Sequence, residues 1–547
     1  MNMTPFEWAL GRLGGLLPEN NTMPLVERLR SAEAGESEWL MGAELLLRDD
    51  PAAAAALLEV AVQKRPDAAR LHYLHGNALR VSGQPGAAEN ALRTAIALDP
   101  AHANASISLA HLLREQGRMK ALAEVMLALW RNEPRSLERD RRIVSFLFEC
   151  ARHAEADGVL PTLLEAHPQD PLLLRHAGEC ALMFGRFDEA RTHLRAAIAV
   201  DPEQASSWLR LAHTHRFVDA DDEDLRLLQS GAARGDLAPD TRVAIGFALG
   251  KALDDLGRLG ESVDMLKRAN ADWHQGHRWD SQAWRAFVAV QLQAPVAVRS
   301  AASSPTIPIF IVGLPRSGTT LVERLLSRDA QIRGRGELNW IASLARQLGP
   351  RVPASNLTAA GNFYLAQLRQ DDPPTRFAID KNPLNFRHLG LIAGMLPMAR
   401  IIHCRRDPRD AALSIWSQHF AHADMAWSYD FGEIGEYARG EAELMAHWRR
   451  VLSLPIFELD YEALVADPET TISAVRRFLG FTADAVPTLF DVPDTISTAS
   501  VWQARQDVHS RSVGRWQRYC GFLPELEAWT GVAGAAGDTL AVFPGQR

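Results

Sequence analysis

The chain has 547 residues, of which 47% are hydrophobic and 23% charged, and its formal net charge is −8. This length predicts two or three domains, because single hydrophobic cores stop growing at about 250–300 residues. The acidic balance gives no support to nucleic acid as the main partner. We find no signal-peptide pattern and no apolar run near the roughly 18 residues that suggest a membrane span.

The four cysteines, Cys150, Cys180, Cys404 and Cys520, are far apart and form no CxxC pair. Their spacing favours buried thiols over a disulfide framework or a zinc site. Free thiols are typical of a reducing compartment, so we expect a cytoplasmic protein.

Prolines recur every 34 residues in the first half of the chain, at Pro66, Pro100, Pro134, Pro168 and Pro202. A 34-residue period is typical of the tetratricopeptide repeat, a helix–turn–helix unit. Small residues stand 24 positions before four of these prolines, and a further unit follows around Gly250, Gly257 and Ala269. The pattern predicts a helical segment at 1–35 and an all-α solenoid of six or seven helix pairs at 36–290.

A single repeat of this kind cannot bury its own apolar face, so neighbours stack and leave a concave groove. We expect this groove to bind a peptide or a partner protein. A spacer or a dimerisation arm is the alternative interpretation of the same pattern.

The pattern changes after residue 290. Residues 291–307 are rich in Ala, Ser and Pro and predict a linker. In the segment 308–547, short apolar runs alternate with helical stretches, and four of the runs predict strands: PIFIVG, TRFAID, MARIIHC and LPIFELD. This alternation predicts an α/β, P-loop-like domain with a parallel central sheet, whose ligands bind beyond the carboxyl ends of the strands.

The first of these strands leads into a glycine-bounded loop, GLPRSGTT at 313–320. Backbone N–H groups of such a loop and the following helix terminus bind phosphate-like anions. Thr319 stands where an NTPase has lysine, and the loop cation is Arg316, which argues against a magnesium-dependent phosphotransferase. We predict an anion-binding loop made of Pro315, Arg316, Ser317, Gly318, Thr319 and Thr320.

A second candidate anion site follows the third strand. Arg406 begins the run Arg-Asp-Pro-Arg-Asp, and Ser414 follows eight residues later on the next predicted helix. The two side chains can converge on one phosphate at the strand ends. A salt-bridged helix cap is the alternative interpretation of this run.

These motifs resemble those of sulfotransferases, and the form P-R-S-G-T-T resembles that of the tyrosylprotein branch. The resemblance covers roughly residues 308–520. It implies that the donor is 3′-phosphoadenosine 5′-phosphosulfate, with its 5′ end on the loop and its 3′-phosphate on Arg406 and Ser414. No metal is expected, because this donor carries less charge than a triphosphate.

The resemblance also implies catalytic roles. Glu337, in Arg-Gly-Glu-Leu, matches the family's base for the acceptor hydroxyl, and Arg316 and Lys381 match cations that act on the sulfuryl group and the leaving group. A helix-cap glutamate and a surface turn lysine are the alternative interpretations. Nucleotide contacts are implied for a further set of residues, namely Tyr461, Ser500 and Arg515.

The acceptor is less defined. Trp340, Leu344 and Gln418 stand where the tyrosylprotein enzymes carry arginines that read acidic peptides. A protein tyrosine, a carbohydrate, a lipid and a small molecule all stay open as sources of the acceptor hydroxyl. An acceptor pocket is one interpretation of Trp416, Trp427 and Trp448, but tryptophans in amphipathic helices are more often part of the core. A repeat scaffold whose second domain binds nucleotide without turnover is the non-enzymatic alternative.

Overall fold

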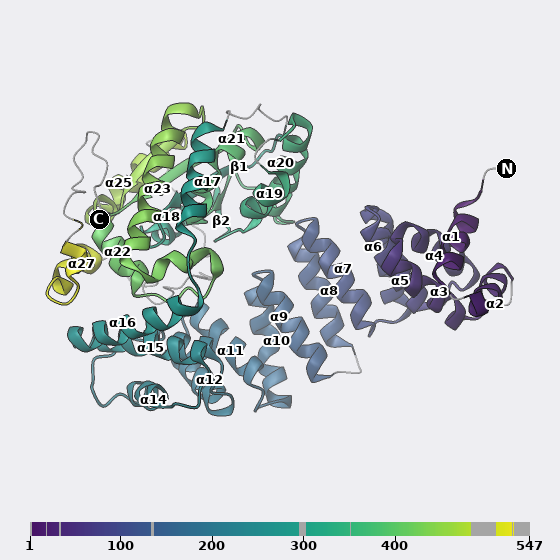
Figure 1. Ribbon diagram of the computed structural model, residues 1–547, viewed down its shortest axis with the longest axis horizontal. Coiled ribbons are helices and arrows are strands. Elements are labelled where there is room, and N and C mark those ends of the chain that lie inside the picture. Colours follow the sequence, from purple (N-terminus) through teal and green to yellow (C-terminus); the bar gives the residue numbers. More distant parts are fainter. Residues whose placement is uncertain are drawn as a thin grey trace. The chain divides into compact units, whose positions relative to one another are not determined.

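The computed structural model of the protein describes residues 3–17, 19–31, 34–132, 136–294, 302–349, 352–482, 510–527 and 529. The chain forms two compact units, one of residues 1–159 with 370–372 and one of residues 160–369 with 373–547. Figure 1 shows helices throughout the first half of the chain and a mixed helix and strand region in the second half. No helix among these described ranges combines the length and apolar character needed to cross a bilayer.

The first unit is helical, and the repeat prediction is confirmed in its helix pairs. Gly76 on one helix leaves room for Leu92 on the next, since a Cβ at Gly76 would lie 2.6 Å from Leu92 Cγ. Its helices are α1 (Pro5–Leu16), α2 (Glu19–Arg30), α3 (Glu36–Asp49), α4 (Pro51–Lys64), α5 (Ala69–Val81), α6 (Pro85–Leu98), α7 (Ala103–Glu115), α8 (Met119–Arg131), α9 (Leu137–Glu149) and the start of α10 (His153–Ala166).

The second unit begins with further helices of the same kind. The contact between a small residue and a leucine recurs at Gly178 with Leu194 and at Gly250 with Leu266, at 2.6 and 2.7 Å. These helices are α11 (Pro171–Met183), α12 (Phe187–Val200), α13 (Ala205–Ala212), α14 (Glu223–Ala232), α15 (Pro239–Asp255), α16 (Leu259–Gly276) and α17 (Ser281–Gln293).

A five-stranded sheet forms the centre of the remainder, in the order β2-β3-β1-β4-β5 with every neighbouring pair parallel. The four predicted strands are confirmed, and the short β2 was not predicted from the sequence. Along β1, Phe310 and Val312 join one hydrophobic core, while Ile309 and Ile311 join the other, so the sheet is covered on both faces. The strands are β1 (Ile307–Gly313), β2 (Ile332–Gly334), β3 (Phe377–Asp380), β4 (Arg400–Arg405) and β5 (Ile456–Asp460).

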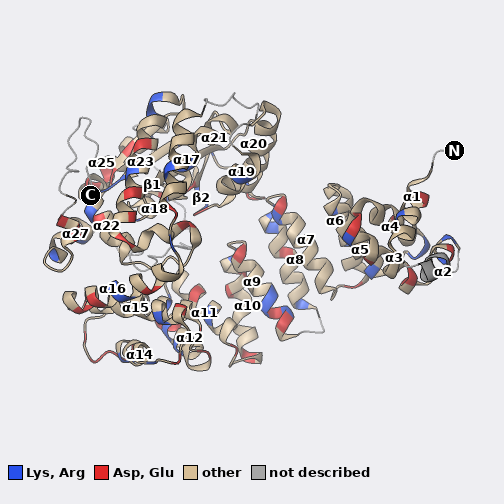
Figure 2. Ribbon diagram, viewed as in Figure 1, with Lys and Arg blue, Asp and Glu red and all other residues tan. Residues whose placement is uncertain are grey.

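Helices and 3-10 turns connect and cover these strands. They are α18 (Thr319–Leu326), α19 (Trp340–Leu348), α20 (Ala354–Arg369), η1 (Pro383–His388), α21 (Leu389–Met395), α22 (Pro408–Trp416), η2 (Ala423–Tyr429), α23 (Phe431–Val451), α24 (Tyr461–Ala466), α25 (Pro468–Phe478), η3 (Ser510–Ser512), η4 (Arg515–Tyr519) and α27 (Pro524–Glu527). Figure 2 shows basic and acidic residues interspersed along the helices.

Helices α15, α16 and α17 share a hydrophobic core with the α/β part of the second unit. Phe247 and Trp273 belong to the same cluster as Phe310 of β1 and Trp448 of α23. The last repeat helices are therefore packed into the α/β fold through apolar side chains. The tryptophans Trp416, Trp427 and Trp448 are at most 4% exposed and lie in this core, so their core interpretation is confirmed.

Close packing of α17 on α23 provides a test of this shared core. Gly440 faces Trp284, and a Cβ at Gly440 would lie 2.6 Å from Trp284 Nε1. We expect Gly440→Ala to destabilise the second unit by about 1–3 kcal/mol through overpacking. Urea unfolding measures this, with Gly276→Ala as the control, because no atom lies within 4 Å of a Cβ there. Equal stability of the two variants would contradict the packing.

Candidate functional site

The predicted anion-binding loop lies at the carboxyl end of β1. Gly313 and Gly318 both have positive φ, and a Cβ at either would lie 2.4 Å from another residue, Cys404 O and Tyr461 Cδ2 respectively. Glycine is required at both positions for conformation and for space. Gly318 also occupies the N-cap of α18, so the loop leads directly into a helix terminus that favours anions.

The loop opens into a cavity of about 590 Å³, within the size range of small-molecule sites. Most of the predicted site residues line it: Pro315, Arg316, Gly318, Thr319, Thr320, Glu337, Arg406, Ser414, Tyr461 and Arg515. Ser317 does not, since it is 1% exposed and its hydroxyl donates to Leu314 O at 2.7 Å. Ser500 lies outside the described residues.

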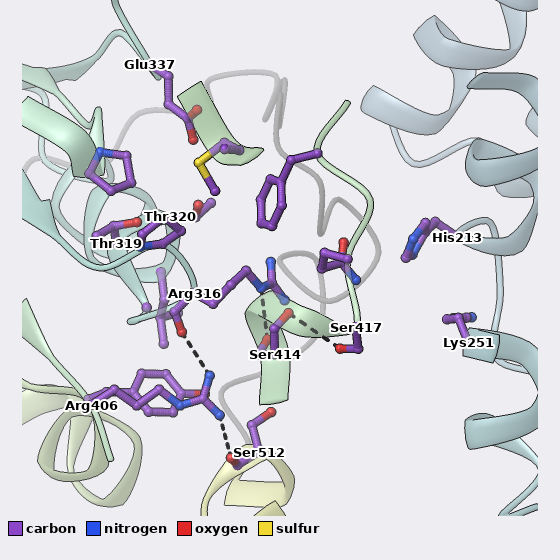
Figure 3. Close-up of a pocket in the computed structure, with 18 of the residues that line it drawn as sticks. His213, Lys251, Arg316, Thr319, Thr320, Glu337, Arg406, Ser414, Ser417 and Ser512 are labelled. Atoms are coloured by element: carbon purple, nitrogen blue, oxygen red, sulfur yellow. Dashed lines mark hydrogen bonds between the residues drawn. The ribbon is translucent and has the colours of Figure 1, made fainter. Parts of the chain in front are cut away.

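Arg316 has a side chain that spans the centre of the cavity (Figure 3). Its Nε donates to Ser414 Oγ at 3.0 Å, and its own φ is +69°, an unusual value for a residue other than glycine. Burial, together with the nearby charges of Arg406 and Arg515, lowers the pKa of Arg316 to about 10, so it stays charged at neutral pH. Strain and charge repulsion are thus concentrated at one residue, as is common at functional sites.

Arg406 links the loop to a second segment. Nη1 donates to Arg316 O at 2.9 Å, Nη2 donates to Ser512 O at 2.5 Å, and the guanidinium lies 4.6 Å from the centroid of the Tyr461 ring. Arg406 is therefore held between three segments at the edge of the cavity, as Figure 3 shows.

The rest of the Arg-Asp-Pro-Arg-Asp run has a structural role. Asp407 caps α22 by accepting from Arg409 N at 2.9 Å, and it pairs with the Arg409 side chain at 2.8 Å. Asp410 is 2% exposed and accepts from Gly514 N and Trp516 N at 2.7 and 2.9 Å. The helix-cap interpretation thus holds for Asp407 and Arg409, while Arg406 and Ser414 face the cavity.

Glu337 and Lys381 form an ion pair at the other end of the cavity. Lys381 Nζ donates to Glu337 Oε1 at 2.5 Å, and the lysine side chain is 1% exposed while that of Glu337 is half exposed. Lys381 is thus a buried partner of Glu337, and it does not line the cavity itself. Its surface-turn interpretation is wrong, because the residue is 1% exposed and its backbone N–H also donates to Gly336 O at 2.8 Å, in the loop that carries Glu337.

Asp380, next to Lys381, anchors this end of the cavity. Burial raises the pKa of the Asp380 carboxyl to about 7. Hydrogen bonds from Tyr364 Oη at 2.7 Å and Asn385 Nδ2 at 3.1 Å have the opposite, smaller effect on this pKa. The backbone N–H of Leu338 also donates to Asp380, which fixes the turn that follows Glu337.

Residues of the last repeats form another part of the cavity wall, which the sequence had not indicated. His213, Arg216, Lys251 and Asp254 come from α13–α15 and their connections. Figure 3 shows His213 and Lys251 across the cavity from Ser414 and Ser417. Burial and the nearby cations lower the pKa of His213 to about 3, so its imidazole is neutral at physiological pH. Arg387, Arg511 and Arg518 also line the cavity without having been predicted.

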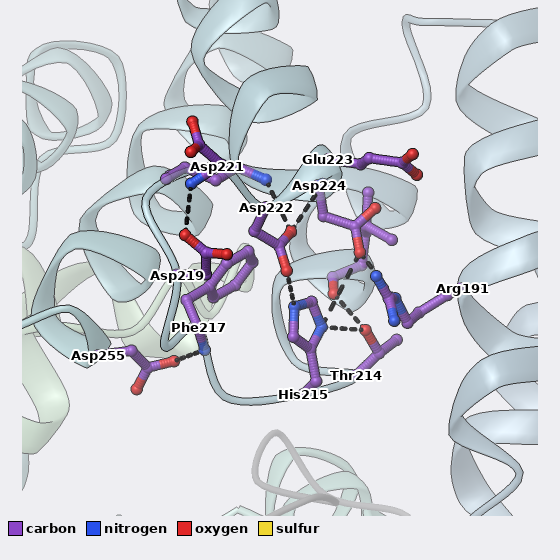
Figure 4. A network of polar contacts seen from close by, with 12 residues as sticks. Arg191, Thr214, His215, Phe217, Asp219, Asp221, Asp222, Glu223, Asp224 and Asp255 are labelled. Carbon is purple, nitrogen blue, oxygen red and sulfur yellow. Dashed lines mark hydrogen bonds and ion pairs between the residues drawn. The ribbon is translucent and has the colours of Figure 1, made fainter.

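A separate cluster of polar side chains on the repeats has the composition of a metal site. His215, Asp222 and Asp224 place ligand atoms within 4.8 Å of one another, an arrangement that a metal ion could use. However, Asp224 pairs with Arg191 at 2.8 Å, and His215 pairs with Asp222 at 3.1 Å (Figure 4). The cluster is therefore an internal ion-pair network that holds α14 in place.

The four cysteines are free thiols, and Cys150, Cys180 and Cys404 are buried, as expected. Burial raises the pKa of the Cys150 thiol to about 11, so it is protonated and unreactive at neutral pH.

Comparison with known proteins defines the class of both parts. The model of the sulfotransferase family matches residues 308–485, and that of the tetratricopeptide repeat matches residues 73–129, 151–205 and 184–215. The two matched regions are the two that the sequence predicted, a tetratricopeptide repeat region followed by a sulfotransferase domain.

Individual relatives are distant. An uncharacterized protein of Aquifex aeolicus is 27% identical over 410 residues, covering 70% of this chain and 53% of that protein. Protein-tyrosine sulfotransferase 2 of Gallus gallus is 22% identical over 189 residues, covering 31% and 50%. The chain therefore spans about half the length of these curated relatives. The solved sulfotransferase domain of the Synechococcus PCC 7002 olefin synthase is 19% identical with a TM-score of 0.28, covering 41% of this chain and 90% of that one.

Proposed function

We propose that this protein transfers a sulfuryl group from 3′-phosphoadenosine 5′-phosphosulfate to an acceptor hydroxyl. The observation that carries the proposal is the convergence of Arg316, Arg406 and Arg515 on one cavity at the carboxyl edge of the sheet, beside a loop built to bind an anion. Like charges brought together in this way are stabilised by an anionic ligand. A nucleotide with groups at both its 5′ and 3′ positions supplies two such anions.

The proposed reaction divides the work among residues of this chain. The acceptor oxygen attacks sulfur, the bond from sulfur to the phosphate oxygen breaks, and 3′-phosphoadenosine 5′-phosphate leaves. Glu337 takes the proton of the acceptor hydroxyl, since its half-exposed carboxylate faces the cavity and Lys381 holds its orientation. Arg316 stabilises charge on the sulfuryl oxygens. Lys381 acts through its ion pair with Glu337, on the acceptor side, because it does not line the cavity where the leaving group would lie.

Donor contacts are proposed for the loop residues 315–320, for Arg406 and Ser414 at the 3′-phosphate, and for Tyr461, Ser500 and Arg515 around the nucleotide. No metal is required, because the arginines supply the positive charge. The acceptor hydroxyl could belong to a protein tyrosine, with the repeats binding the partner that carries it. The free thiols support a cytoplasmic location.

Turnover with a panel of acceptors tests this proposal. The full chain is incubated with the donor in EDTA and with tyrosine peptides, glycans, lipids or small phenols and alcohols. We expect 3′-phosphoadenosine 5′-phosphate to be released together with a sulfated product for at least one class. Transfer of phosphate from ATP that requires magnesium would instead indicate a phosphotransferase and would contradict the proposal.

A further inference from the structure

The 510–520 segment lines the cavity with Arg511, Ser512, Arg515 and Arg518, and it is held from two sides. On the α/β side, Asp410 accepts from Gly514 N and Trp516 N, and Arg406 donates to Ser512 O. On the repeat side, Asp254 of α15 accepts from Arg515 Nη2 at 2.7 Å and from the Tyr519 hydroxyl. The segment therefore bridges the last repeat and the α/β fold.

Arg515 is placed by this arrangement with its charge toward the cavity. Its Nη2 donates both to Asp254 and to Tyr519 Oη, at 2.7 and 3.1 Å. A guanidinium has five N–H groups in a rigid fork. Fixing Nη2 on the repeat side orients the N–H groups of Nη1 and Nε, and Arg515 lines the cavity. The side chains of Asp254 and Arg515 are 19% and 24% exposed, so the contact is partly shielded from water.

A second contact keeps α16 against the same region. Lys267 Nζ donates to Phe522 O at 3.2 Å, and the Phe522 ring lies 3.1 Å from a Cβ built at Gly260. Phe522, two residues beyond the segment, is thus fixed on α16, while the segment itself is fixed on α15, and both helices share the hydrophobic core of the α/β part.

We propose that the last repeat completes the nucleotide site, with Asp254 as the positioning residue that orients Arg515 toward the 3′-phosphate of the bound nucleotide. The assignment to the 3′-phosphate follows from the anchoring of the segment, since Arg406 and the α22 residue Asp410, which hold it, lie at the proposed 3′-phosphate site. The inference rests on the proposed function and extends it, because it makes a repeat residue part of donor recognition.

The negative charge of Asp254, considered by itself, predicts the opposite change in nucleotide affinity. Asp254 is an anion beside an anion site, so removing it should tighten nucleotide binding if only its Coulomb field acts. If Asp254 acts by orienting Arg515, removing it should weaken binding. The sign of the change therefore separates positioning from simple electrostatics.

Calorimetric titration of the full chain in metal-free buffer is the experiment, with 3′-phosphoadenosine 5′-phosphate and adenosine 5′-phosphate as the two probes. We expect Asp254→Asn to weaken binding of the first by about 10- to 150-fold, the range for loss of one hydrogen bond to a charged group. The second probe lacks the 3′-phosphate, and its binding should change by less than about twofold. Asp264→Asn is the matched control, because it removes the same charge from an exposed position outside the cavity.

A double-mutant cycle adds a readout that a purely structural role of Asp254 would not reproduce. Once Arg515→Ala has removed the guanidinium, adding Asp254→Asn should cost no further affinity. Additive losses, unchanged binding in Asp254→Asn or tighter binding in that variant would each overturn this inference while leaving the proposed function intact. No binding of 3′-phosphoadenosine 5′-phosphate by the wild-type protein would overturn both.

Discussion

Replacing Glu337 with glutamine is expected to lower kcat by about 10²- to 10⁴-fold, the range typical of a lost general base. The variant keeps the shape of the side chain and removes its capacity to accept a proton. Lys381 then loses the carboxylate that it contacts at 2.5 Å. Affinity for 3′-phosphoadenosine 5′-phosphate should stay within about twofold, because the arginines and the loop are untouched.

The measurement is steady-state release of 3′-phosphoadenosine 5′-phosphate with an acceptor from the turnover panel, together with a calorimetric titration of each variant. Glu443→Gln is the matched control, since Glu443 is an exposed residue of α23 and does not line the cavity. A wild-type kcat in Glu337→Gln would exclude this residue as the base. A loss of nucleotide affinity as large as the loss of kcat would instead assign it to binding.

Replacing Arg406 with alanine is expected to weaken binding of 3′-phosphoadenosine 5′-phosphate by about 100-fold or more. Each hydrogen bond to a charged group contributes about 1.5–3 kcal/mol, and 1.4 kcal/mol corresponds to tenfold in affinity. The change also removes the contacts of Arg406 with Arg316 O and Ser512 O, which hold the loop and the 510–520 segment together.

Arg405→Ala is the control for this change. Arg405 is the preceding residue, it is 46% exposed, and it pairs with Glu458 and Asp460 away from the cavity. We expect Arg405→Ala to bind 3′-phosphoadenosine 5′-phosphate as tightly as the wild-type protein does. In Arg406→Ala, the affinity for adenosine 5′-phosphate should fall much less than the affinity for 3′-phosphoadenosine 5′-phosphate. Equal losses for the two nucleotides would mean that Arg406 does not contact the 3′-phosphate.

Local sequence signals were sufficient for much of the architecture. The 34-residue proline spacing predicted the repeats because each unit reuses the same turn and the same close helix contact, as at Gly76 and Gly178. The predicted strands were apolar runs that end in a glycine or a charged residue, and the loop could be found because Gly313 and Gly318 have backbone conformations that favour glycine. The strand β2 has three residues and left no comparable pattern.

The parts of the site that the sequence did not predict depend on contacts between segments that are distant in the chain. Asp254 and Arg515 are 261 residues apart, and nothing in either local sequence indicates that they meet. The burial of Lys381 follows from the packing of β3 against the loop that carries Glu337, which a turn sequence such as Asp-Lys-Asn-Pro does not reveal.

Titration of the full chain with 3′-phosphoadenosine 5′-phosphate in EDTA, compared with ADP and ATP, tests the central claim most directly. We expect 3′-phosphoadenosine 5′-phosphate to bind more tightly than ADP and ATP, independently of magnesium, and to bind more weakly as salt is added, because arginines hold the ligand. Absence of binding, or equal binding of ATP that requires magnesium, would contradict the assignment of the cavity as a sulfuryl-donor site.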